Sequence, residues 1–323
     1  MPAERSAAAS LKPVDSAEVA IVMDLFLDVL IAGSTDVRRF PLAYDWTDRD
    51  CLLAEHGFSA LVTVETAGTR SAVLLDAGLS ATALRNNLDV MQIDATNLRA
   101  LAISHGHADH HGGLEGLFSR YGRMRMPLVI HPDAWRDRKI ALPTGVEIHM
   151  PPPNRNDLER EGLTVVDERG PTLLIDDTVL VSGQVPRTTD FEKGFPGHLK
   201  RGAGGGWEPD PLIEDDQNLI VNVRDKGLVI VSSCSHSGAI NVCRNASALT
   251  GEHRIAAFIG GFHLTGGLFE PIIPSTVEAL REFAISRLVP AHCTGWRATH
   301  MLARTFPDAF VQPSVGTVFR FAA

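Results

Sequence analysis

The sequence has no excess of basic residues, and this absence excludes two classes of partner. Lysine and arginine together number 30, against 39 aspartates and glutamates, which gives a formal net charge of −9 with histidine neutral. Non-specific binding to nucleic acid or to an anionic membrane depends on a basic surface. We therefore expect a small-molecule substrate, anionic ones included, and no nucleic-acid or membrane partner. The sequence leaves the oligomeric state open.

Long apolar runs and cysteines are also scarce. The longest apolar run, from Val19 to Gly33, contains Asp24 and Asp28 and is too short to span a bilayer. The first residues lack the continuous apolar stretch that an export signal requires. In such a chain, the 4 cysteines are expected to be reduced thiols rather than disulfides. These observations favour a cytoplasmic protein.

Glycine and proline carry no period, which excludes a collagen-like chain, and no internal repeat is evident. The Ala- and Ser-rich residues 1–13 are expected to form a mobile tail, and residues 14–323 a single domain. Short β-branched runs alternate with turn residues and helical patterns, which predicts packed sheets flanked by helices. The glycine-rich segment 201–207 lacks the Lys and Ser or Thr of a P-loop and is expected to be a flexible or lid-like loop. The expected strands are 19–23, 60–65, 72–75, 100–103, 128–130, 172–175, 178–181, 219–223, 228–231 and 256–259, and the expected helices are 81–88, one from about 114, 239–250, 274–285 and 296–306.

The most informative stretch runs from Ile103 to Gly113 and reads ISHGHADHHGG. Its imidazoles and carboxylate are costly to bury unless something satisfies them. Neutral imidazole nitrogens and carboxylate oxygens are ligands of Zn²⁺ and related divalent ions. His105 and His107 point the same way in an extended segment and can share one ion. Asp109 and His110, on the following turn, can reach a second ion. A solvated histidine-rich loop is the alternative.

The HxHxDH pattern, with LLDAG at 74–78 before it, resembles the metallo-β-lactamase superfamily. Other segments resemble one subgroup, the dihydropterin–ribofuranosylaminobenzene-phosphate synthase-like proteins. These segments are LAEHGFS at 53–59, SGQVPR at 182–187, SCSHSG at 233–238, IGGFHL at 259–264 and PAHCTG at 290–295. The similarity runs from about Val19 to residues 316–318, which is nearly the whole chain.

The resemblance implies an αββα sandwich, in which two packed β-sheets are flanked by helices and the active-site loops meet at one edge. It also implies one or two divalent metal ions, Zn²⁺ first, with Mn or Fe as alternatives. Asp76 matches the usual strand-end Asp, which we interpret as a group that orients the histidine loop; an ordinary turn carboxylate is the alternative. The ligands implied are His105, His107 and His236 for the first ion, and Asp109, His110 and His292 for the second.

One feature departs from the superfamily. Most of its hydrolases have a metal-bridging Asp after the fourth-motif strand, but here strand 255–259 leads into GGFH at 260–263, without a carboxylate. The second ion is therefore expected to be held less tightly, or to be absent. Because neighbours in an extended segment face opposite sides, Phe262 is expected in the core and His263 in the pocket, as a ligand, a proton donor or an anion binder. A buried core histidine is the alternative.

The remaining candidates are single residues. His56, in the AEHG stretch, is expected to line the pocket, with stabilisation of a turn as the alternative. Arg187 could grip an anionic substrate with its forked guanidinium, or face solvent. Cys234 and Cys293 lie beside ligand histidines, and we expect both to be buried free thiols. No role is assigned to His111, His131, His149, His198, His253 or His300.

The function implied is that of a metal-dependent hydrolase, which attacks an ester, phosphoester or lactone-like bond with a metal-activated water. Asp109 would orient the nucleophile while it binds the metal, and His263 could protonate the leaving group. Alternatives are a metal-dependent synthase or transferase of a pterin- or phosphoribosyl-type substrate, and an iron-dependent oxidoreductase. A non-catalytic binding protein is a further alternative, which the intact ligand positions disfavour.

The first prediction concerns metal content. The purified protein should bind one to two transition-metal ions per chain, counted by elemental analysis. Replacing both His105 and His107 with Ala should remove the first ion and any activity, because both side chains are expected to bind it. A double variant that keeps the full metal content contradicts this ligand assignment.

Overall fold

The computed structural model describes residues 10–41 and 51–323. Most of the expected N-terminal tail, residues 1–9, lies outside these ranges. Lys12, in the described part of that tail, is tied to the rest of the protein. Its backbone N–H donates to the carbonyl of Asp177 at 2.8 Å, and its ammonium lies 3.1 Å from the Asp177 carboxylate. The chain is therefore attached to the fold before it reaches Val14.

One of the two large β-sheets has eight strands, in the order β2-β18-β1-β3-β4-β5-β6-β9. The pairs from β2 to β4 are antiparallel, and those from β4 to β9 are parallel. The strands are β1 (Ser16–Met23), β2 (Val37–Arg38), β3 (Ser59–Thr66), β4 (Thr69–Leu75), β5 (Leu98–Ala102), β6 (Pro127–Ile130), β9 (Thr164–Asp167) and β18 (Val318–Ala322).

The other large sheet has six strands, in the order β10-β11-β14-β15-β16-β17. Here the pairs from β10 to β15 are antiparallel, and β15, β16 and β17 are parallel. The strands are β10 (Thr172–Leu174), β11 (Val179–Val181), β14 (Leu219–Val223), β15 (Gly227–Ser232), β16 (Ile255–Gly261) and β17 (Leu288–Ala291).

The two sheets pack face to face over a layer of small and β-branched side chains. Val62 and Val64 of β3 and Val229 and Val231 of β15 belong to this layer and are almost completely buried. Alternation along each strand directs every second residue into the layer. The β-branched residues of this layer belong to the short runs from which these strands were predicted.

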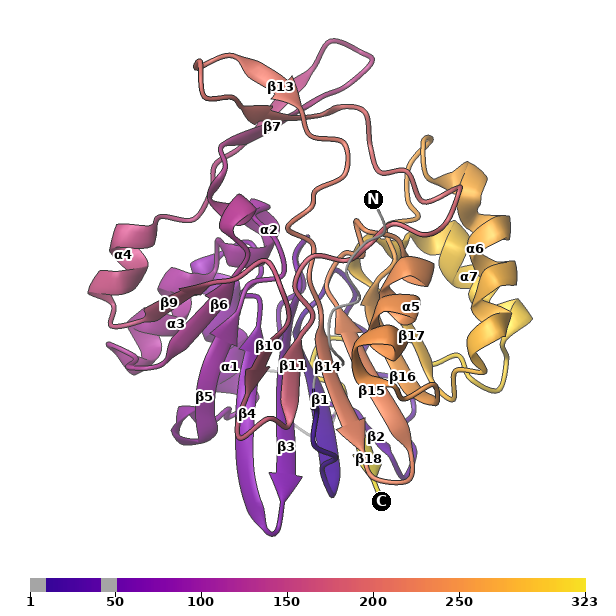
Figure 1. The fold of residues 1–323 in the computed structure, drawn as a ribbon. Helices are drawn as coiled ribbons and strands as arrows, with labels where there is room; N and C mark the ends of the chain where they lie inside the picture. Colours follow the sequence, from indigo (N-terminus) through magenta and orange to yellow (C-terminus); the bar gives the residue numbers. More distant parts are fainter. Residues whose placement is uncertain (1–9, 42–50) are drawn as a thin grey trace.

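Helices cover the outer faces of both sheets (Figure 1). The eight-stranded sheet is covered by α1 (Ala81–Val90), α3 (Leu114–Tyr121) and α4 (Arg155–Arg160), and the six-stranded sheet by α5 (Ala239–Thr250), α6 (Ile273–Leu280) and α7 (Trp296–Thr305). Shorter helical turns are α2 (Ala108–His111), η1 (Ala95–Asn97), η2 (Pro132–Trp135), η3 (Glu270–Ile272), η4 (Arg281–Phe283) and η5 (His292–Thr294). The expected αββα sandwich is confirmed. Within the described ranges, no helix combines the length and apolarity that crossing a membrane requires.

A third, four-stranded sheet was not expected from the sequence, and we call it the arm. Its order is β13-β12-β7-β8, from β7 (Arg138–Ala141), β8 (Glu147–Met150), β12 (His198–Arg201) and β13 (Trp207–Pro209). Residues 202–206, within the glycine-rich segment, form the turn between β12 and β13. The strands on either side lack an apolar alternation. Arg201 and Lys139 lie over the Trp207 ring, at 3.9 and 4.8 Å from its centroid. Figure 1 shows the arm above the sandwich edge that carries α2.

Every expected strand and helix overlaps an element of the structure. Strands missed outside the arm are β2, β9, β17 and β18. Two of them carried weak signals, since β17 contains Pro290 and β2 has only two residues.

Phe319 in β18 tests the layer between the sheets. Its side chain is completely buried there, so replacing it with Ala leaves a cavity. We expect the free energy of unfolding to fall by about 3–5 kcal/mol, measured by urea denaturation. Phe26, which is 37% exposed, is the matched control, and Phe26→Ala should cost clearly less. Equal losses at the two positions would contradict this account of the core.

Candidate metal centre

The predicted site residues follow the carboxyl ends of parallel strands in both sheets. Asp76 follows β4 and the histidine loop follows β5, whereas three further loops leave β15, β16 and β17. Because parallel strands of one sheet end at the same edge, and the two sheets are packed together, these loops meet. The structure thereby brings together His105, His107, Asp109, His110, His236, His263 and His292.

The first ligand group consists of His105, His107 and His236. Nε2 of His236 lies 3.1 Å from Nε2 of His105, and the His107 ring centroid is 4.5 and 4.8 Å from those of His105 and His236. Burial, followed by the positive charge of neighbouring groups, holds the pKa of all three well below the ordinary value for histidine. They are therefore neutral imidazoles, which is the form that binds a metal.

The second group consists of Asp109, His110 and His292. Oδ2 of Asp109 lies 3.5 Å from Nε2 of His110 and 3.4 Å from Nε2 of His292. Burial raises the pKa of Asp109, but His110 and His292 outweigh it and lower the pKa, so the carboxylate is ionised. The two groups are adjacent, since the rings of His105 and His110 are 4.2 Å apart.

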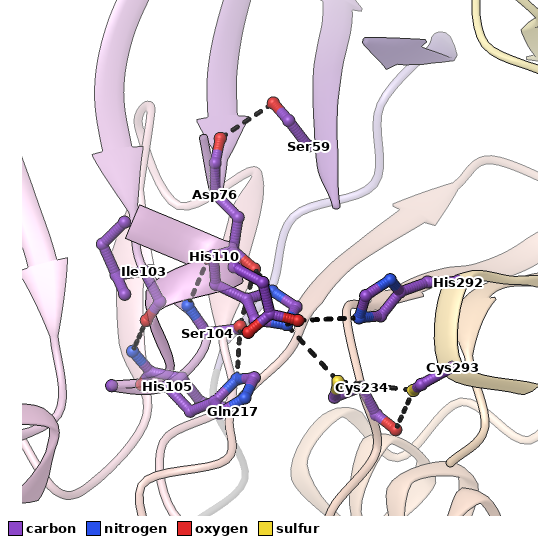
Figure 2. Close-up of polar contacts among 12 residues, drawn as sticks. Ser59, Asp76, Ile103, Ser104, His105, His110, Gln217, Cys234, His292 and Cys293 are labelled. Atoms are coloured by element: carbon purple, nitrogen blue, oxygen red, sulfur yellow. Dashed lines mark hydrogen bonds and ion pairs between the residues drawn. The ribbon is translucent and has the colours of Figure 1, made fainter. Parts of the chain in front are cut away.

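Asp76 fixes the histidine loop from behind (Figure 2). Oδ1 accepts the backbone N–H of Ser104 at 2.7 Å, and Oδ2 accepts the Ser104 hydroxyl at 2.6 Å and lies 2.7 Å from Nδ1 of His110. These contacts are those of a group that orients the loop, as the sequence predicts for Asp76. Gly113 allows the end of the histidine loop to pack closely against the backbone of Ala77, because a Cβ atom at this position would lie 1.9 Å from the Ala77 carbonyl oxygen.

The electrostatics of the cluster favour a bound cation. Burial opposes protonation of His110, but Asp109 and Asp76 raise its pKa to about 10. Nε2 of His107 and Nδ1 of His292 are buried and accept or donate no hydrogen bond within the described part of the chain. Buried polar atoms without partners are costly, and a divalent ion would satisfy them. The donor set therefore fits the metal that the sequence predicts.

His263 lies where the sequence predicts it. Its ring centroid is 4.2 Å from that of His236, whereas Phe262 is buried and stacks on Phe258 at 4.5 Å. A left-handed backbone, with φ of 47° at His263, turns the chain at this point. The ring also packs edge-on against Phe269 at 4.5 Å.

His56 and Arg187 lie beside different ligand groups. His56 is exposed at the mouth, with Nε2 3.7 Å from Oδ2 of Asp109. Arg187 instead lies behind His236: its Nη1 donates to the His236 carbonyl at 2.8 Å, and Nη2 donates to the carbonyl of Leu212. With its guanidinium directed at backbone carbonyls, we expect Arg187 to position His236 rather than to grip substrate.

Two adjacent carboxylates that the sequence did not single out hold the loops of the first group. Asp215 accepts the N–H of Gly106, between His105 and His107, at 2.8 Å. Asp216 accepts both the N–H, at 2.9 Å, and the hydroxyl of Ser237. Next along the chain, Gln217 binds the histidine loop, with its side-chain amide donating to the carbonyl of Ile103 at 2.8 Å (Figure 2).

Arg138 connects this support to the arm. It is fully buried, donates to both oxygens of Asp215 at 2.5 and 3.1 Å, and donates from Nε to Asp210 at 2.8 Å. Burial alone would lower its pKa, but the two carboxylates raise it, so the guanidinium stays charged. The charged run RDRK at 136–139 gave no sign of burial, because the partners of Arg138 lie more than seventy residues away.

His198 of β12 brings an imidazole from the arm to the first group. It is buried, and its ring centroid lies 5.2 Å from that of His107 and 5.7 Å from that of His236. Burial, followed by the nearby charges of His263 and Arg138, lowers its pKa to about 3. The sequence HLKR has no metal-ligand spacing, so only the folded structure identifies His198 as a residue of the site.

Arg138→Met tests the link between the arm and the histidine loop. The substitution leaves Asp215 buried without its cation, whereas Asp210 keeps Lys200 at 3.4 Å. We therefore expect the free energy of unfolding to fall by about 3–5 kcal/mol, measured by denaturant titration. Arg160→Met, at an exposed residue of α4, is the control and should have little effect. Unchanged stability in Arg138→Met would show that the buried ion pair is not needed.

Comparison with known proteins supports the fold and the resemblance. A family model described as the anti-Pycsar protein Apyc1 matches residues 56–137. A 7,8-dihydropterin-6-methyl-4-(β-D-ribofuranosyl)-aminobenzene-5′-phosphate synthase from Methanocaldococcus jannaschii is 28% identical over 297 residues, which is 90% of this chain and 98% of the relative. An uncharacterized protein of the same archaeon is 29% identical over 273 residues, 82% of this chain and 93% of that protein.

Among solved structures, a metal-dependent hydrolase of the β-lactamase superfamily matches with a TM-score of 0.71 and 24% identity, over 95% of this chain and 100% of the other. The resemblance drawn from the sequence is therefore confirmed. The chain has the metallo-β-lactamase fold and is similar in sequence to an archaeal dihydropterin–ribofuranosylaminobenzene-phosphate synthase.

Proposed function

We propose that the protein is a metal-dependent hydrolase that cleaves an ester, phosphoester or lactone-like bond in a small molecule. The observation that carries the proposal is the convergence of five neutralised or carboxylate-paired histidines and Asp109 on one buried edge. Similarity to a structure titled as a metal-dependent hydrolase supports the same class.

The residues divide the work of holding the ions. His105, His107 and His236 would hold one ion, and Asp109, His110 and His292 the other. Their nitrogen and oxygen donors suit Zn²⁺, with Mn or Fe as alternatives. When bound, a divalent ion lowers the pKa of water and polarises the substrate oxygen that it contacts.

Asp109 orients the attacking water, and His263 protonates the leaving group. The ionised Oδ2 of Asp109 accepts a hydrogen bond from the attacking water and so directs its lone pair at the substrate. His263 is partly exposed beside His236, where it can donate a proton to the leaving oxygen. His198 brings the arm next to His107 and His236, where it would limit the access of bulk water.

A second candidate is a synthase that joins a pterin-type to a phosphoribosyl-type substrate. The observation that favours it is the similarity to the archaeal synthase over 98% of that enzyme's length. Fold alone does not decide between the two reactions.

A substrate panel separates the two candidates. Protein loaded with Zn²⁺ or Mn²⁺ should hydrolyse at least one of the nitrophenyl esters, nitrophenyl phosphodiesters or lactones supplied, and removal of the metal with a chelator should abolish the turnover. Product formation only when a pterin-type and a phosphoribosyl-type substrate are both present would instead support the synthase.

His263→Ala tests the proton donor within the same assay. Loss of general-acid catalysis should lower kcat about 10²-fold or more, with the metal content unchanged by elemental analysis. His300→Ala, at an exposed histidine of α7, is the matched control. Loss of one metal would make His263 a ligand, and full activity with full metal content would leave it only a structural role.

A further inference from the structure

Cys234 lies between the two ligand groups. Its proximity to His236 in the sequence did not reveal this position. Its Sγ forms one cluster with ligand atoms of His105 and His236, and another with those of His110 and His292, each cluster within 4.8 Å. The sulfur is 3.4 Å from Nε2 of His110 (Figure 2). No other described residue belongs to both of these histidine clusters.

The spacings are those of ligands around a common ion. With Zn–N bonds of about 2.0–2.1 Å and Zn–S bonds of about 2.3 Å, neighbouring ligand atoms of a tetrahedral site are about 3.3–3.6 Å apart. The 3.4 Å between Cys234 Sγ and His110 Nε2 falls within this range, and the 3.1 Å between His105 and His236 is slightly shorter. Small shifts of side chains would therefore suffice for coordination.

Gly261 explains why sulfur replaces a carboxylate. This residue stands where the superfamily usually has its bridging Asp, but a Cβ atom there would lie 2.4 Å from the carbonyl oxygen of Ser233 and 2.7 Å from Sγ of Cys293. No side chain fits at Gly261 without moving its neighbours. The adjacent space is taken by the two thiols, whose sulfur atoms are 3.3 Å apart.

We propose that Cys234 is a thiolate ligand shared by the two metal positions, in place of the missing bridging carboxylate. This inference rests on the metal binding of the proposed function. Coordination releases the thiol proton to solvent, and the S–H of Cys293, which is directed at Sγ of Cys234, donates a hydrogen bond to the sulfur. A soft thiolate favours Zn²⁺ or Co²⁺ over Mn²⁺.

Cobalt substitution of the full chain tests the proposal without an activity assay. Co²⁺ is added to the metal-free protein in the presence of a phosphine reductant. The bound ion is counted by elemental analysis, and the near-ultraviolet spectrum is recorded, since a thiolate ligand gives an intense charge-transfer band. Wild type should show this band. Cys234→Ser should lose it and bind the more weakly held Co²⁺ at least tenfold less tightly.

Matched cysteine variants assign the band. Cys243 is buried in α5 away from the clusters, so Cys243→Ser should keep the wild-type spectrum, and Cys293→Ser should keep the band as well. A triple variant, Cys51→Ser with Cys243→Ser and Cys293→Ser, retains Cys234 alone. It should keep the band, and it decides the question even if Cys234→Ser does not fold.

The outcomes separate this proposal from the proposed function. Wild type that binds two Co²⁺ ions without a thiolate band, or a triple variant that lacks the band, overturns the role of Cys234 and leaves the hydrolase proposal standing. A band that disappears only in Cys293→Ser also overturns it. Wild type that binds no Co²⁺ at all overturns both.

Discussion

The burial of imidazoles beside carboxylates at one edge of the sandwich is the constraint on which the rest of the structure depends. His105, His107, His110, His198, His236 and His292 are all buried there. Water can no longer solvate them, so a charge on any one of them must be matched by a neighbour. Most of them therefore stay neutral, and the positive charge gathers at His110, between Asp76 and Asp109. That combination of neutral donors around a cation-favouring centre is what a divalent metal requires.

Such a cluster also needs a rigid frame, because ligand atoms must be held in place before the ion arrives. Asp76 holds the histidine loop from the side of the eight-stranded sheet. On the other side, Asp215 accepts a hydrogen bond from the histidine loop, and Asp216 accepts one from the loop that carries His236. Arg138 then neutralises Asp215 and joins the arm to this frame. The arm is thereby coupled to the metal loop, and it brings His198 to the same site.

Much of the sandwich could be predicted from the sequence because its signals are local. The β-branched runs of β3 and β15 and the helical period of 239–250 can be read within a dozen residues, and HxHxDH is contained in one short loop. The arm and its ion pair could not be predicted, since the strands are short and charged and Arg138 meets its carboxylates only in the fold. For the same reason His198 could not be assigned a role from the sequence, since its contact with His107 joins segments about ninety residues apart.

Cys234 shows how the packing around one residue can decide which side chain reaches the metal positions. From the sequence, the absence of a carboxylate at Gly261 predicts weaker binding of the second ion. That prediction considers only the position at which the superfamily usually supplies its bridging ligand. In the structure, the volume beside Gly261 is filled from the opposite loops by two sulfur atoms. In our proposal, the carboxylate that is missing at the end of β16 is replaced by the Cys234 side chain, which comes from the loop after β15. The affinity of the second position therefore depends on what the neighbouring loops provide, which only the packing of the strand ends determines.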